Sequence, residues 1–182
     1  MKVSEGEMTF LDHLEELRWH IIRSAVAVLV VAVIAFVFKD YIFALLFAPK
    51  NGDFFTYQMF CKVGHWFNFE SDFCAEQLPF TIQSRTMAGQ FSAHIWTSIW
   101  TGVIVAFPYV LYEVWRFISP GLYDNERKLA RGFILVASIL FFIGVLFGYY
   151  LITPLSVNFL GSYSVSPEVK NQIDIDSYIS VV

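Results

Sequence analysis

Long uncharged runs alternate with short charged segments along this chain. Three apolar stretches without a charge cover residues 24–38, 86–112 and 132–150. A helix needs about 20 mostly apolar residues to cross about 30 Å of hydrocarbon, so each run predicts one membrane-spanning helix. The predicted spans are residues 19–38, 91–112 and 132–151.

A helix start precedes the first run. Residues 9–12, Thr-Phe-Leu-Asp, have the S/T-x-x-D/E form of a helix N-terminus. Beyond them, an apolar stripe and a polar stripe recur at helical spacing; the first holds Leu11, Leu14, Leu17 and Ile21, and the second His13, Glu16, His20 and Arg23. Residues 1–18 are therefore predicted to be an amphipathic helix that lies on the membrane surface before the chain turns in.

The segments between the spans complete the predicted organisation. Residues 39–90 and 152–174 are expected as loops on the outer side, 113–131 as a loop on the cytoplasmic side, and 175–182 as the start of a fourth span. Pro49 and Gly52 end the first helical region, and FTYQMF (55–60) is a candidate short strand. The predicted fold class is all-α: a polytopic transmembrane helical bundle forming a single membrane domain over residues 1–182.

The distribution of Lys and Arg predicts the orientation. Four of these residues fall within the short segment 113–131, whereas the four in 39–90 are spread over a much longer stretch. Cytoplasmic loops carry the excess of positive charge, so the N-terminus and 113–131 are predicted to face the cytoplasm.

Composition agrees with a membrane protein. Hydrophobic residues make up 57% of the chain and charged residues only 15%, against about 25% charged residues in ordinary soluble domains. The net charge of -4 argues against nucleic acid as a partner, because phosphate binding requires clustered Lys and Arg.

The first span differs from a cleavable signal peptide. Its Ala-x-Ala triplet, Ala25 to Ala27, lies at the wrong end of the apolar run, and a long mixed-charge segment precedes it. An uncleaved span is the better interpretation. The two cysteines, Cys61 and Cys74, both lie in the predicted outer loop, where an oxidising compartment favours a disulfide; two free thiols are the alternative.

The residue patterns offer little support for catalysis. His13, Glu16 and His20 carry groups that bind zinc, but their spacing is not H-E-x-x-H. A haem would need axial histidines that meet, and His20 and His94 belong to opposite ends of their spans. No nucleophile motif or phosphate loop is visible, so we predict no metal site, no cofactor and no enzymatic activity; a metal-dependent membrane enzyme is kept as a minor alternative.

Carboxylates beside the predicted spans are more informative. Glu16 and Glu126 lie at helix starts on the predicted cytoplasmic side, and Glu113 follows the uncharged part of the second span. A charge next to hydrocarbon is costly unless water, a partner or a function retains it. Pairing with a nearby side chain, such as Glu16 with His20, would explain why each carboxylate is retained there. Alternatively, two carboxylates on one face could clasp a cationic ligand such as a guanidinium group.

Glycine and proline residues suggest structural features within the spans. Pro108 removes a backbone hydrogen bond and is expected to kink the second span. Pro120 helps to end that helical segment. Gly144 and Gly148 form a Gly-x-x-x-Gly pattern that permits close approach of helices.

Two motifs resemble the TatC family, the receptor subunits of the twin-arginine protein translocase. They are HLEELRWHIIRS (13–24) and FPYVLYEVWRFISPGLYDNERK (107–128), in the family's order and topological place; DIDSYISVV (174–182) is similar to its entry into span four. The resemblance covers about residues 9–50 and 86–182. Residues 51–85, with both cysteines, take nothing from it.

The resemblance implies a site for signal peptides of folded cargo. The family's two glutamates that contact the paired arginines match Glu16 and Glu126. Motif positions that shape the same site match Arg18, Pro49, Pro108, Phe117 and Tyr123. Glu113 stands where many relatives have glutamine, and it either strengthens arginine binding or is simply solvated.

The resemblance also implies partners and a location. The partners are single-span TatA- and TatB-type subunits, other TatC copies and the lipid bilayer, with the proton-motive force supplying the work. The location is the bacterial cytoplasmic (inner) membrane. The family has six spans, whereas this chain stops as the fourth begins, so a fragment is expected to bind weakly. A membrane assembly or structural protein without a receptor role is the alternative.

Overall fold

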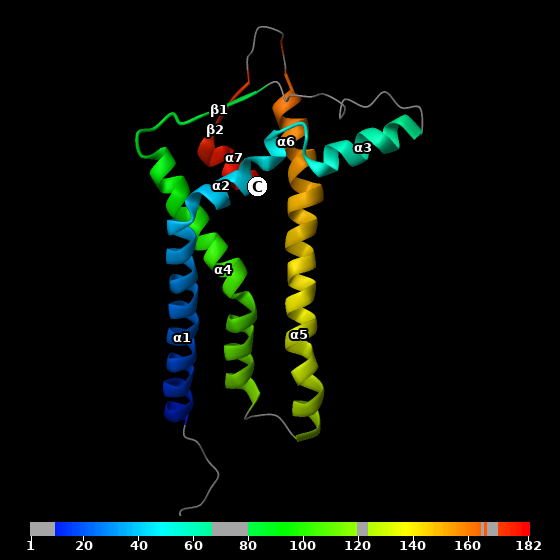
Figure 1. Cartoon of the computed structure of the whole chain (residues 1–182). Helices are drawn as coiled ribbons and strands as arrows, with labels where there is room; N and C mark the ends of the chain where they lie inside the picture. The colour runs from blue at the N-terminus through cyan, green and yellow to red at the C-terminus, as the bar shows by residue number, and fades with distance from the viewer. Residues whose placement is uncertain (1–9, 67–79, 120–123, 165, 167–170) are drawn as a thin grey trace, which may run out of the picture. The chain divides into compact units, whose positions relative to one another are not determined.

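A computed structural model describes residues 10–66, 80–119, 124–164, 166 and 171–182 (Figure 1). The side chains of residues 10–12 and 124–131 lie outside this description. The described residues form two compact units, and three long helices pass from one unit into the other: α1 (Phe10–Val37), α4 (Gly89–Ile118) and α5 (Asp124–Phe147).

The three predicted spans are confirmed as helices of membrane-crossing length. Within the described chain, the stretches that are long and apolar enough are His13–Val37, Gly89–Ile118 and Gly132–Ser162. One detail differs from the prediction. α1 is continuous from Phe10 to Val37, so the amphipathic segment does not turn at residue 19 but extends the first span. Helical hydrogen bonding has no reason to stop there, since neither proline nor glycine interrupts residues 10–37.

The first unit contains residues 1–34 and 99–140. Here α1 and α4 approach closely, because Gly102 has no side chain. A Cβ at Gly102 would lie 2.8 Å from the carbonyl oxygen of Val28 and 2.9 Å from the Cβ of Ala32. Ala32 and Ala106 are buried, so small residues form this helix crossing, as is usual in membrane proteins. Pro108 lies inside α4, as expected.

The second unit, residues 35–98 and 141–182, holds most of the shorter elements. They are α2 (Lys39–Phe47), the 3-10 helix η1 (Ala48–Lys50), α3 (Phe55–Trp66), β1 (Thr81–Gln83), the π-helix η4 (Gly148–Ile152), α6 (Thr153–Ser162), β2 (Gln172–Asp174) and α7 (Ile175–Val181). Strands β1 and β2 pair in parallel, with Thr81 opposite Gln172. The predicted outer loops are thus largely structured, and the candidate strand at 55–60 is wrong because these residues begin α3.

Tyrosine hydroxyl groups hold the second unit together. The hydroxyl of Tyr57 contacts the carbonyl oxygens of Pro49 and Pro154, both at 3.0 Å, and that of Tyr178 donates to Leu46 at 2.9 Å. The last carbonyls of a helix lack intrahelical partners, so these bonds satisfy the end of α2 and η1. Burial raises the pKa of Tyr57 to about 12. A small core of Phe80, Val157 and Tyr178 lies alongside.

Candidate functional site

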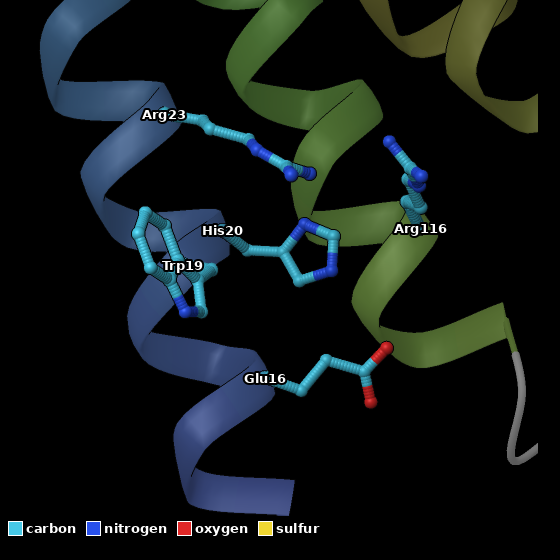
Figure 2. A pocket seen from close by; sticks show the side chains of 5 residues that line it. All are labelled: Glu16, Trp19, His20, Arg23 and Arg116. Carbon is cyan, nitrogen blue, oxygen red and sulfur yellow. The ribbon is translucent and has the colours of Figure 1, made fainter.

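A pocket in the first unit lies between α1 and α4. Its volume is about 420 Å³, and its lining residues are Glu16, Trp19, His20, Arg23 and Arg116. Figure 2 shows Glu16, His20 and Arg23 projecting from α1 toward α4, from which Arg116 projects. The pocket therefore combines one carboxylate, two guanidinium groups, an imidazole and an indole.

The helical repeat of α1 arranges these groups. Residues 16, 20 and 23 are spaced by four and three, so they lie on one face of the helix. This is the polar stripe that the sequence predicts. Glu16 and Arg23 are seven residues apart, which places them about 10 Å apart along the helix axis. The pocket thus has an acidic end and a basic end.

A buried ion pair forms the wall of the pocket behind His20. The Nδ1 of His20 lies 2.5 Å from a carboxylate oxygen of Glu113, and the second oxygen accepts a hydrogen bond of 2.9 Å from the hydroxyl of Tyr109. Glu113 is only 2% exposed and His20 7%. Both oxygens of the carboxylate therefore have a partner, which is what a charge inside a membrane helix requires.

This network excludes two of the alternatives that the sequence leaves open. Glu113 is not solvated, because α4 turns it toward α1 and not toward water. His20 pairs with Glu113 across the helices rather than with Glu16 one turn away. The sequence shows neighbours along one helix, whereas the partner here lies 93 positions away.

Aromatic packing supports the same end of the site. The ring of Phe117 stacks on His13 with centroids 4.4 Å apart, and it meets His20 edge-on at 6.1 Å. Phe117 thus holds the imidazoles of α1 against α4. Arg18 is exposed and is not among the lining residues of the pocket.

The remaining predicted site residues fall into several places. Glu126 lies in the first turn of α5, with its side chain outside the described set, and Tyr123, Pro120 and Cys74 lie outside the described residues. Cys61 is disulfide-bonded, and the predicted pairing with Cys74 stays a prediction. Pro49 is fully buried. In the described structure, a Cβ at Gly144 or Gly148 would meet no atom of another element within 4 Å.

Three lining residues of the pocket were not predicted as site residues from the sequence. Trp19 and Arg116 were not singled out, and Arg23 was noted only as part of a polar stripe. A signal for Arg116 exists in the sequence: it follows Glu113 by three residues and so shares a helix face with it. His94, considered as a haem ligand, instead contacts the carbonyl oxygen of Phe36 at 3.1 Å.

Comparisons with known proteins place this geometry in context. Residues 12–182 match the model of the family described as Sec-independent protein translocase protein (TatC). A relative of that name from Blattabacterium sp. subsp. Periplaneta americana (strain BPLAN) is 40% identical over the whole chain, which covers 69% of the relative. The relative from Escherichia coli (strain K12) is 30% identical over 98% of the chain and is covered to 60%.

A solved structure is similar as well. It is described as the crystal structure of the twin arginine translocase receptor TatC, and it matches 92% of this chain with a TM-score of 0.68 and 30% identity. The chain covers 64% of that structure. The chain therefore spans roughly two thirds of the length of these relatives.

Proposed function

Because the chain belongs to the TatC family of Sec-independent protein translocase proteins, we propose that it acts as a receptor for twin-arginine signal peptides. Together with its three apolar helices, this membership makes it a multi-pass membrane protein of a transport family rather than of a family of catalysts. The observation that carries the proposal is the half-buried carboxylate of Glu16 at one end of the pocket.

The chemistry of the pocket suits an arginine side chain at its acidic end. Glu16 has no ion-pair partner among the described residues, so its carboxylate is available for a two-pronged bond with a guanidinium group. The indole of Trp19, also in the pocket lining, is 56% exposed, and an indole face attracts cations. Glu16, directed toward α4 (Figure 2), supplies the carboxylate for an incoming arginine.

The basic end of the pocket needs a different part of the peptide. Arg23 and Arg116 repel a second arginine, but their guanidinium groups can donate hydrogen bonds to carbonyl oxygens. We assign the second arginine of the peptide to Glu126, near the start of α5. Arg18, Phe117 and Tyr123 contribute as shaping residues, and Glu113 contributes indirectly by positioning His20.

The surroundings of the site follow from the same proposal. We place the N-terminus and residues 113–131 in the cytoplasm of a bacterial cell and the spans in its inner membrane. Folded cargo then delivers its signal peptide to the pocket from the cytoplasm. Single-span TatA- and TatB-type subunits and further TatC copies would assemble around the bundle.

Peptide titration tests the proposal. A fluorescent signal peptide with Arg-Arg or Lys-Lys is titrated into the purified 182-residue chain in lipid nanodiscs. Arginine forms two-pronged bonds where lysine offers a point charge, so the Arg-Arg peptide should bind more tightly. Glu16→Gln should weaken Arg-Arg binding by tenfold or more, since a hydrogen bond to a charged group contributes about 1.5–3 kcal/mol and about 1.4 kcal/mol is a factor of ten.

Glu15→Gln is the matched control. It removes the same charge from the neighbouring position of the same helix, but Glu15 is exposed and is absent from the pocket lining. Its binding should equal that of the wild type. Equal binding of both peptides to all three proteins would contradict the receptor role and would favour a structural or assembly role in the membrane.

A further inference from the structure

Helix α3 carries an exposed apolar stripe that the proposed receptor site does not use. The stripe consists of Phe55, Met59 and Val63, which are 67%, 56% and 42% exposed. Their spacing of four places them on one face of the helix, and Trp66, 83% exposed, extends it. The stripe belongs to the segment 51–85, which the motifs of the family do not cover.

The other two sides of α3 differ: one packs against the second unit, and the other carries exposed polar side chains. Thr56 and Tyr57 are buried against the second unit, and Phe60 and Gly64 follow on the same side and are half-buried. Gln58, Lys62 and His65 are exposed on the remaining side. Thus one side of α3 contacts its own unit, one is polar, and one carries the exposed apolar side chains of Phe55, Met59 and Val63.

Hydrogen bonds attach α3 to the end of a span. The hydroxyl of Thr56 donates to the carbonyl oxygen of Tyr150. The hydroxyl of Tyr57 contacts the carbonyl oxygen of Pro154. Both acceptors belong to the continuous apolar stretch Gly132–Ser162. Figure 1 shows α3 lying across the direction of η4 and α6.

The position of Tyr150 gives the depth of α3 in a bilayer. The charge-free run begins at Gly132, directly after Arg131. Eighteen residues at about 1.5 Å each raise Tyr150 about 27 Å above Gly132, close to the full thickness of about 30 Å of hydrocarbon. With Gly132, next to the charge of Arg131, at one edge of the hydrocarbon, the start of α3 is held at the opposite edge, near the headgroups.

Large apolar side chains are also exposed on the span to which α3 is attached. Phe147 and Ile152 on the attached span are 57% and 49% exposed, as expected of side chains in contact with acyl chains. A helix at the headgroup level with one apolar and one polar side lies in the plane of the interface, and aromatic rings favour that level. We propose that α3 is an interfacial helix whose stripe Phe55–Met59–Val63 inserts into the lipid leaflet beside the spans.

Spin labelling tests this inference independently of the receptor role. Met59→Cys and Val63→Cys report on the stripe, and Gln58→Cys on the polar side of the same helix is the matched control. No described cysteine is free. The wild type, which lacks the introduced cysteine, is treated with the same spin label to measure background labelling. The labelled chains are placed at low density in vesicles of phosphatidylethanolamine and phosphatidylglycerol. Collision with oxygen, which concentrates in hydrocarbon, is compared with collision with a water-soluble nickel chelate.

The expected result is a several-fold higher ratio of oxygen to nickel collisions at positions 59 and 63 than at position 58. Nickel-dominated collisions at all three positions would overturn the proposal, because the stripe would then face water. Protection of positions 59 and 63 from both reagents would also overturn it, since that pattern indicates a protein partner over the stripe.

Discussion

Glu113 joins two helices of the first unit through a single carboxylate. Its partners are the imidazole of His20 on α1 and the hydroxyl of Tyr109 one turn earlier on α4. The pair lies behind the pocket wall, so its geometry sets the position of the face that carries Glu16. The Glu113–His20 pair thereby positions Glu16 in the proposed site without touching the peptide.

Removing one member of the pair should destabilise the chain strongly. His20→Ala leaves the buried carboxylate of Glu113 without its imidazole partner, and removing one partner of a buried pair of this kind typically costs about 3–5 kcal/mol. We expect a clear fall in the thermal unfolding midpoint of the detergent-solubilised protein, measured by circular dichroism.

A double variant serves as the control for that measurement. His20→Phe combined with Glu113→Met replaces both charges with apolar groups of similar size, which is often close to neutral. Recovery of the unfolding midpoint is expected. An unchanged midpoint in His20→Ala alone would show that the pair contributes nothing to stability.

At the level of elements, hydrophobic length predicted the spans because it is a local property of the sequence. Residues 86–112 contain no charge and are long enough by themselves to cross the hydrocarbon as a helix. The pairing of His20 with Glu113 depends instead on how two helices rotate against each other, which no spacing in one segment records. The same holds for α3, whose helical form depends on the contacts of Thr56 and Tyr57.

The crossing of α1 and α4 should depend on Gly102. Replacing it with leucine would force side-chain atoms into the carbonyl of Val28 and the methyl group of Ala32, both within 3 Å of a Cβ at this position. Overpacking of this kind costs about 1–3 kcal/mol. We expect Gly102→Leu to lower the unfolding midpoint and weaken peptide binding together.

Gly144→Leu is the matched control for that substitution. It lies on another span, where a Cβ meets no described atom of another element within 4 Å. Its unfolding midpoint should stay near that of the wild type. Equal loss in both variants would mean that added side-chain bulk on any span, not the crossing, explains the effect.

For the whole molecule, the orientation in the membrane is a prediction from charge. Gln83→Cys lies in β1 on the predicted outer side and is exposed, and Lys128→Cys lies in the predicted cytoplasmic segment. A membrane-impermeant thiol reagent added to intact cells should label position 83. Position 128 should react only after lysis, and the reverse pattern would refute the orientation.

The second unit is closed by contacts between distant parts of the chain. Tyr57 meets Pro154 across 97 positions, and Tyr178 meets Leu46 across 132. Ribosomes add about 5–20 residues per second, so Tyr57 is made some 5–20 s before Pro154. During biogenesis, the early half of this unit must therefore wait with the hydroxyl of Tyr57 solvated until the third span is synthesised, and its last contact forms only when Tyr178 follows.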